Sequence, residues 1–231
     1  MPRFFVPGEQ FPAIAGADAH QIRNVLRMKI GDEVELLDGS GKIYSAKIVR
    51  IGKDKVETEI VSEKLEESEP RIKITLAQAL PKGQKMDFII EKAVELGASK
   101  IIPLTTERTI AKNAKPERWQ KLAKEAAEQS GRALIPEVSP LTRFEEVLKM
   151  RNQFNLALIP WELEREMTLK SALVHRPSSI LVLIGPEGGF SHNEITLAKE
   201  GGFISVSLGR SILRAETAGL AVLSAIMYEL E

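Results

Sequence analysis

The sequence contains no cysteine and only three histidines among its 231 residues. The absence of cysteine excludes thiolate nucleophiles, disulfide bonds and thiolate zinc sites, and it suits a reducing compartment. His20, His175 and His192 lie far apart in the sequence, without the short spacing that helical metal ligands need. We therefore predict no metal site.

Long apolar runs are also missing. Residues 1–7 lack an apolar core of signal-peptide length, and the longest apolar run is the short segment 180–184. We expect a cytoplasmic protein that is neither secreted nor membrane-spanning. Because 43% of the residues are hydrophobic, the chain can still bury a substantial core without disulfides or a structural metal.

An excess of charge of one sign is absent too, since 32 Lys and Arg residues balance 32 Asp and Glu residues. The net charge therefore gives no support for nucleic-acid binding, and any such site must be a local patch. Residues 1–30 carry a small positive excess, with Arg3, Arg23, Arg27 and Lys29 against Glu9 and Asp18. Such charges are most often a solvated surface, so both interpretations of this patch stay open.

Residues 1–68 are predicted to form a small β-barrel. A helix-like stretch at 18–27 is followed by short runs that alternate apolar and polar residues between glycine-containing turns, at 33–37, 42–51 and 55–61. This pattern predicts short antiparallel strands, which usually close into a small barrel. The acidic stretch 63–70 ends in proline and favours an exposed connector, so we place a second domain at 71–231.

The second domain is predicted to be α/β with a parallel sheet. Short apolar runs predict strands at 72–78, 100–104, 136–139, 155–159, 180–184 and 204–208. Longer stretches between and after them predict helices at 86–96, 116–130, 144–150, 167–174, 193–199 and 215–230. Strand and helix in alternation indicate a parallel sheet that is covered on both faces.

The stretch 180–194 is the most informative segment of the sequence. A buried strand leads into a loop with Gly185, Gly188 and Gly189, and Ser191 and Glu194 match the capping box that opens a helix. Glycines let a ligand approach the backbone amides, and ligands in open α/β sheets bind beyond the carboxyl ends of strands. A plain strand-to-helix turn accounts for the same residues, so spacing alone does not decide.

A second glycine loop follows the next strand. Gly209 ends the run 204–208, and Arg214, Glu216 and Thr217 lie at the start of the final helix. Two neighbouring strands would thus bring glycine loops to one edge of the sheet, which is more specific than either loop alone. The plainer interpretation is that Glu216 complements the helix dipole and that Thr217 caps the helix or bonds its backbone.

Leu-Ile-Gly-Pro-Glu-Gly-Gly-Phe at 183–190 and Leu-Gly-Arg-Ser-Ile-Leu-Arg-Ala-Glu-Thr-Ala at 208–218 resemble two cofactor-loop motifs of one family. These are the 16S ribosomal RNA uridine N3-methyltransferases, the RsmE family of the SPOUT superfamily. The resemblance continues upstream at 20–27, 83–97 and 128–132, in the same order along nearly the whole chain.

The resemblance implies a PUA-like barrel for RNA, followed by a SPOUT domain whose C-terminal segment is threaded into a trefoil knot. It also implies a homodimer, 16S rRNA of the 30S subunit as partner, and S-adenosylmethionine as methyl donor without a metal. The implied cofactor contacts lie in three loops: Leu158, Pro160, Ile184, Gly185, Gly188, Gly189, Leu208, Gly209, Leu213 and Thr217.

The implied reaction is attack by uracil N3 on the sulfonium methyl group. Deprotonated uracil carries negative charge on N3, O2 and O4, and Arg214 is our candidate for stabilising that charge. Glu216 is the nearest candidate base, but it would need a pKa raised by burial. Alternatively, the proton leaves to solvent and Glu216 only orients Arg214 or caps the helix.

Six residues are our candidates for RNA contact: Arg3, His20, Arg23, Arg27, Arg108 and Arg132. His20, Arg23 and Arg27 are spaced to share one helical face, while Ile22, Val25 and Leu26 would pack that helix on the barrel. Arg108 and Arg132 resemble family positions near the RNA or the dimer edge. Surface solvation explains such arginines equally well, as does a helix C-terminal charge for Arg132.

Three other functions compete with this prediction. A ribose 2′-O-methyltransferase of the same fold would share the cofactor loops and differ in the target atom. A non-catalytic rRNA-binding assembly factor would not need intact cofactor loops. A nucleotide-phosphate enzyme using 185–189 is disfavoured, because no lysine or metal-binding carboxylate set accompanies the loop.

Overall fold

The computed structural model describes residues 1–6, 8–39, 41–65, 69–111 and 113–231. Contacts divide the chain into two compact units, Met1–Glu69 with Ala127–Ile135, and Pro70–Ala126 with Pro136–Glu231. Part of the expected connector, residues 66–68, lies outside the described residues. Each unit has a sheet and a buried apolar cluster of its own.

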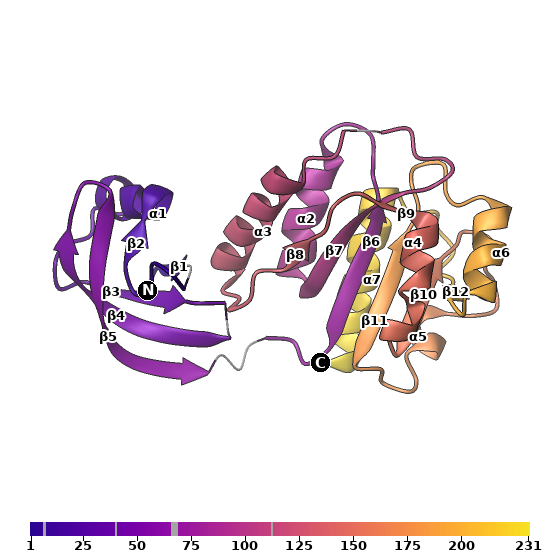
Figure 1. Cartoon of the computed structure of the whole chain (residues 1–231). Coiled ribbons are helices and arrows are strands. Elements are labelled where there is room, and N and C mark those ends of the chain that lie inside the picture. The colour runs from indigo at the N-terminus through magenta and orange to yellow at the C-terminus, as the bar shows by residue number, and fades with distance from the viewer. Residues whose placement is uncertain (7, 40, 66–68, 112) are drawn as a thin grey trace. The chain divides into compact units, whose positions relative to one another are not determined.

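In the described part of the first unit, five strands form a barrel-like sheet in the order β1-β3-β4-β5-β2 (Figure 1). They are β1 (Arg3–Phe5), β2 (Ile14–Ala15), β3 (Glu33–Leu37), β4 (Lys42–Ile51) and β5 (Lys55–Leu65). Strands β3, β4 and β5 are antiparallel, as their alternating pattern predicted, whereas β1 joins β3 in parallel. The inward residues Val34, Leu36 and Ile48 are buried in one apolar cluster.

The helix of the first unit differs from the prediction. Helix α1 (Gly16–His20) continues as a π-helix, η1 (Gln21–Val25), in which the amide of Leu26 donates to the carbonyl of Gln21 at 2.9 Å. The wider turn buries Ile22 but leaves Val25 68% exposed and Leu26 41% exposed. The expected packing of all three apolar residues on the barrel is therefore wrong for Val25 and Leu26.

The described part of the second unit contains a seven-stranded sheet in the order β12-β10-β11-β6-β7-β8, with β9 paired to β7. The strands are β6 (Lys73–Ala79), β7 (Ala98–Thr105), β8 (Glu137–Val138), β9 (Thr142–Arg143), β10 (Leu156–Pro160), β11 (Ser179–Ile184) and β12 (Ile204–Val206). Every pairing is parallel, so the predicted parallel α/β domain is confirmed. Only β9 was not predicted.

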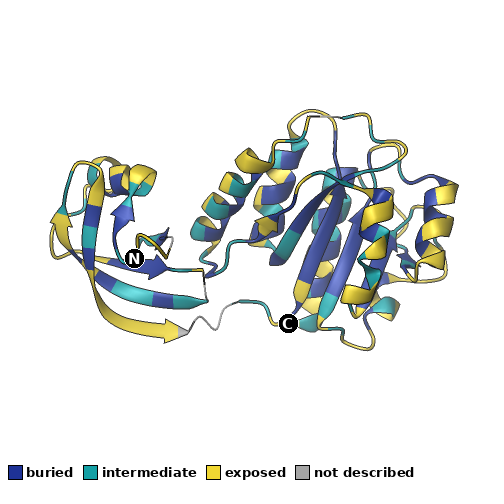
Figure 2. Ribbon diagram, viewed as in Figure 1, coloured by how far each residue is buried: buried dark blue, intermediate teal, exposed yellow. Residues whose placement is uncertain are grey.

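Helices cover both faces of this sheet, and the strands are buried between them (Figure 2). On one face Ala77 and Leu183 cluster with Phe144 and Ile195, while on the other Leu76 and Ile184 lie beneath Gly219. This alternation is the period of two that a strand imposes. The helices are α2 (Lys85–Glu95), α3 (Pro116–Ser130), α4 (Phe144–Lys149), η2 (Arg151–Gln153), α5 (Leu169–Ala172), α6 (His192–Glu200) and α7 (Ala215–Leu230).

The connection between β12 and α7 crosses the carboxyl edge of the sheet. Strand β12 is an edge strand beside β10, yet α7 packs against β6, β11 and α2. Residues 207–214 therefore pass over the ends of β10 and β11 before α7 begins. This crossing brings the loops that follow three strands to one place, while the knot implied by the family resemblance stays a prediction.

Candidate active site

A cavity of about 530 Å³ lies at the carboxyl edge of the second unit's sheet. Its walls are the segments that follow β10, β11 and β12, together with the first turn of α7 and Lys85 at the start of α2. Open parallel sheets bind ligands at this edge, because the loops there are free of the strand ladder. The cavity thus occupies the position at which the sequence predicted a ligand.

Two glycines of the loop after β11 lie close to neighbouring side chains. Gly189 has a φ of 66°, in the left-handed region, and a Cβ there would lie 2.9 Å from Oε1 of Glu162. A Cβ on Gly185 would lie 3.2 Å from the ring of Phe190. Glycine at these positions keeps the backbone tight against its neighbours and leaves it unshielded on the cavity side.

The same loop is held by the segment that follows β7. Arg108 donates from Nη1 to the carbonyl of Gly188 at 2.8 Å and to that of Phe190 at 3.4 Å. The predicted capping box is present, with the amide of Ser191 donating to Glu194 at 2.8 Å and the amide of Glu194 donating to Oγ of Ser191 at 3.2 Å. These bonds fix the shape of the glycine loop from outside the cavity.

The loop after β10 is pinned by one carboxylate. Glu164 accepts hydrogen bonds from the hydroxyl of Ser205, in β12, and from the amides of Arg165 and Glu166 at 3.0 Å each. These donors lower the pKa of Glu164 to about 2, with the Ser205 hydroxyl as the largest cause. Glu164 is therefore a charged anchor, whose role no sequence motif indicated.

Two charged residues predicted to be catalytic line the cavity. Arg214 is exposed and is the N-cap residue of α7. The carboxylate of Glu216 accepts a hydrogen bond from the ammonium group of Lys85 at 2.9 Å. This hydrogen bond is the main cause of the lowered pKa of Glu216. The lowered pKa contradicts the expectation that burial raises the pKa of Glu216, as a glutamate base would require.

Lys85 was not singled out from the sequence as a site residue. It is the first residue of α2 and lies within the segment 83–97 that carries the family resemblance, which was the available signal. Lys85 contacts Oε1 of Glu216, while the buried Oε2 has no hydrogen-bond partner among the described residues.

Most of the predicted cofactor contacts come together at the cavity. Leu158 and Thr217 are the exceptions: Leu158 is fully buried inside β10, and Thr217 is exposed on α7 outside the cavity lining. Sequence spacing could not separate these two from their neighbours. The predicted residues that line the cavity are Pro160, Ile184, Gly185, Gly188, Gly189, Leu208, Gly209 and Leu213.

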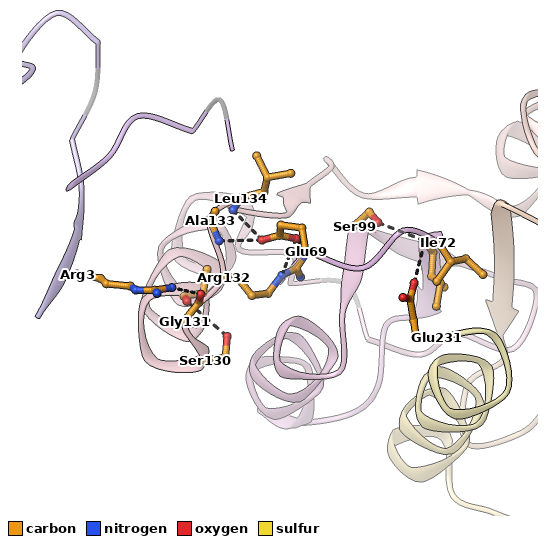
Figure 3. Close-up of polar contacts among 12 residues, drawn as sticks. Arg3, Glu69, Ile72, Ser99, Ser130, Gly131, Arg132, Ala133, Leu134 and Glu231 are labelled. Carbon is orange, nitrogen blue, oxygen red and sulfur yellow. Dashed lines mark hydrogen bonds and ion pairs between the residues drawn. The ribbon is translucent and has the colours of Figure 1, made fainter. Parts of the chain in front are cut away.

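Two of the six predicted RNA-binding residues are occupied inside the first unit (Figure 3). Arg3 donates to Glu35 at 2.6 Å and to the carbonyl of Gly131. Arg132 is 8% exposed and forms an ion pair with Glu69 at 2.9 Å. These internal contacts account for the positions of both arginines.

The other four lie at the surface or near it. His20 is exposed, and Arg23 donates to the carbonyl of Lys53 at 2.8 Å. Arg27 is exposed beyond the end of the helix with a φ of 53°, so the expectation that it shares a helical face with His20 and Arg23 is wrong. Arg108, in the second unit, holds the glycine loop as described above.

The described part of the chain contains no group of three or more His, Asp or Glu side chains placed to hold a metal ion. Within the same ranges, no helix combines the length and the apolar composition needed to cross a membrane.

Family comparisons agree with both units. Residues 67–227 match the model of an RNA methyltransferase domain, and residues 14–61 match that of an RNA methyltransferase PUA domain. The fold and the cavity therefore define the class of RNA methyltransferases in which a small PUA barrel precedes a parallel α/β domain.

Individual relatives narrow the class. The chain is 37% identical over 231 residues to ribosomal RNA small subunit methyltransferase E of Bacillus subtilis, covering 95% of this chain and 90% of the relative. It is 41% identical over 221 residues to the protein of the same name from Synechocystis, covering 93% and 72%. The chain belongs to the ribosomal RNA small subunit methyltransferase E family, RsmE.

A solved structure gives the same result. The Neisseria gonorrhoeae ribosomal RNA small subunit methyltransferase E, bound to S-adenosyl methionine, superposes with a TM-score of 0.91 at 36% identity. The match covers 99% of this chain and 98% of that one.

Proposed function

We propose that this protein transfers the methyl group of S-adenosylmethionine to N3 of a specific uridine in 16S rRNA. The observation that carries the proposal is the cavity of about 530 Å³, walled by two glycine loops at the edge of a parallel sheet. Membership in the RsmE family and the cofactor named for the Neisseria relative support the donor. The choice of N3 as the target atom is our proposal, based on the motif resemblance and on the positive charge of Arg214 at the cavity.

The cavity suits the proposed methyl donor. Pro160, Ile184, Leu208 and Leu213 offer an apolar surface for adenine, and Leu158 supports it from within β10. The carboxylate of Glu162, held against Gly189, faces the same loop and suits a cationic amine or a ribose hydroxyl. When bound, S-adenosylmethionine supplies a methyl group on a sulfonium, so that a neutral thioether leaves.

Arg214 is the residue that we assign to the acceptor base. Its side chain is exposed at the cavity, and it precedes the first turn of α7. A guanidinium here would favour the deprotonated uracil by bonding the oxygens that share its charge. Arg214 thereby acts on the nucleophile, where the chemical difficulty of the reaction lies.

Glu216 has a supporting role in this proposal. Because Lys85 keeps its pKa low, Glu216 stays ionised and is a poor acceptor for the N3 proton. Of the two accounts that the sequence left open, we therefore adopt the one in which the proton leaves to solvent. Glu216 and Lys85 then fix the start of α7, and with it Arg214.

We further propose that the protein acts in the cytoplasm, as a homodimer, on 16S rRNA within the 30S subunit. His20, Arg23 and Arg27 remain our candidates for RNA contact in the barrel. The outer face of α7 exposes the small residues Ser224 and Ala225, and Tyr228 is 89% exposed there, which suits close packing of a second copy. Light scattering of wild type and Tyr228→Glu tests the dimer, which the variant should dissociate.

The proposal is tested by incubating the protein with labelled S-adenosylmethionine and 30S subunits that lack the modification, followed by nucleoside mass spectrometry. We expect 3-methyluridine from the wild type. Label on a ribose would favour the 2′-O-methyltransferase alternative, and cofactor binding without any transfer would favour the assembly factor. A parallel reaction with naked 16S rRNA shows which form of the RNA is the substrate.

A further inference from the structure

A second cavity, of about 290 Å³, lies in the same unit between the start of α2 and the segment that leads into α3. The apolar residues Leu80, Met86 and Trp119, which are almost completely buried, form part of its wall. Its volume is close to the lower limit of ligand pockets, which span roughly 300–1,000 Å³. It suits a single base with its sugar better than a larger ligand.

The rim of this cavity is polar and positively charged. Lys82, Gln84, Asn113 and Lys115 line it and are exposed. Neither Lys82 nor Lys115 forms a salt bridge with any described residue, whereas Lys85 is paired with Glu216. The two ammonium groups therefore stay available to an anion.

The acidic residue of the cavity does not offset these charges. Asp87 accepts from Arg118 at 2.7 Å and from the indole nitrogen of Trp119 at 3.0 Å. Its charge is balanced by a guanidinium, and the bond to Trp119 holds the ring in the cavity wall. Beside the rim Ile110 is 67% exposed, which adds an apolar surface against which a base can pack.

The β6–α2 connection links the second cavity to the cofactor cavity. The amide of Lys82 donates to Oε1 of Glu187 at 2.9 Å, and Glu187 lines the cofactor cavity within the glycine loop. Lys85, in the wall of the first cavity, lies between Gln84 and Met86 of the second. The two cavities thus occupy the two sides of the β6–α2 connection.

We propose that this second cavity binds a nucleotide that flanks the target uridine, with its phosphates at Lys82 and Lys115. The inference rests on the proposed function, since a base presented for methylation must leave its stack and its neighbours in the strand then need sites of their own. Apolar walls with a cationic rim are the chemistry that holds single-stranded RNA. The cavity then sets which sequence context is accepted.

The first test is the double variant Lys82→Ala/Lys115→Ala, measured against 30S subunits. We expect the KM for RNA to rise about tenfold, with kcat at saturating RNA and cofactor affinity unchanged, and the salt dependence of RNA binding to fall by about 1.4 in log–log slope. The matched control is Lys149→Ala/Lys170→Ala, which removes two exposed lysines elsewhere in this unit. Equal KM and slope in the two double variants would overturn the inference and leave the proposed function intact.

The second test does not depend on turnover. RNA carrying 4-thiouridine next to the target uridine is crosslinked to wild-type protein, and the attached peptides are identified by mass spectrometry. We expect peptides that contain residues 80–87 or 110–119. Crosslinks confined to other segments of the protein would show that the cavity does not hold a flanking nucleotide.

Discussion

The cofactor loops of the second unit and the arginines of the first unit were both singled out from sequence, with different outcomes. Of the ten proposed cofactor residues, all but Leu158 and Thr217 line one cavity. In the first unit, by contrast, Arg3 and Arg132 are occupied by Glu35 and Glu69. A glycine role depends on local backbone shape, whereas an arginine role depends on which acid folds beside it.

This difference predicts that substitutions in the loops will alter chemistry or ligand affinity, and that a substitution in the ion pairs of the first unit will alter stability.

Arg214→Ala should lower kcat by about 10²–10³-fold, because it removes the donor aimed at the developing charge. The affinity for S-adenosylmethionine should change little, since the glycine loops stay intact. Single-turnover methyl transfer and calorimetry separate the two quantities. If kcat and affinity fall together, Arg214 helps to build the cofactor site and is not specific to the acceptor base.

Arg132→Ala should destabilise the first unit by about 3 kcal/mol, because it leaves the carboxylate of Glu69 largely buried without its cation. Denaturant unfolding, followed by hydrogen exchange of residues in β3 and β4, measures this loss. Arg27→Ala is the control, since Arg27 is exposed and is still a candidate RNA contact. If Arg132→Ala keeps its stability but shows a reduced salt dependence of RNA binding, Arg132 contacts RNA and its structural role is contradicted.

Gly189→Ala should weaken S-adenosylmethionine binding by about tenfold or more, because alanine disfavours the left-handed φ of 66° at this position and its Cβ would lie 2.9 Å from Oε1 of Glu162. The matched control is Gly202→Ala, which has a φ of 84° but lies in the turn after α6, away from the cavity. The control should lose some stability and keep its affinity. Equal affinities in the two variants would mean that the shape of this loop does not matter for the cofactor.

Glu164→Gln should cost about 1 kcal/mol at neutral pH, since it weakens hydrogen bonds to a charged acceptor without removing them. Folding lowers the pKa of Glu164 from its ordinary 4.5 to about 2, so this contribution is present above pH 4.5 and is lost as the pH falls toward 2. Thermal unfolding of both proteins between pH 7 and pH 2 measures it. A stability difference that does not shrink in acid would contradict the charged-anchor role.

The fold was largely predictable because each signal was local. The six helices and six of the strands in the second unit follow from apolar period and glycine turns, and the capping box at Ser191 was read directly. The two-residue strand β9 is too short to show a period. The π-helix at Gln21–Val25 could not be predicted, because its extra residue per turn leaves no signature in an ordinary helical pattern.

Charged contacts were the part that sequence could not supply. Lys85 lowers the pKa of Glu216 although the two residues come from helices at opposite ends of the second unit's sequence. Arg108 was proposed for RNA, and its partner turned out to be the carbonyl of Gly188 in the glycine loop. Such pairings form only when the sheet brings distant loops to one edge, so the fold must be known first.

The most direct test of the central claim is the nucleoside composition of 16S rRNA from cells that lack this protein. We predict that 3-methyluridine disappears from the small subunit RNA, returns with the wild-type protein, and stays absent with Arg214→Ala. Unchanged 3-methyluridine in the deletion strain, or loss of a ribose-methylated nucleoside in its place, would contradict transfer to uridine N3.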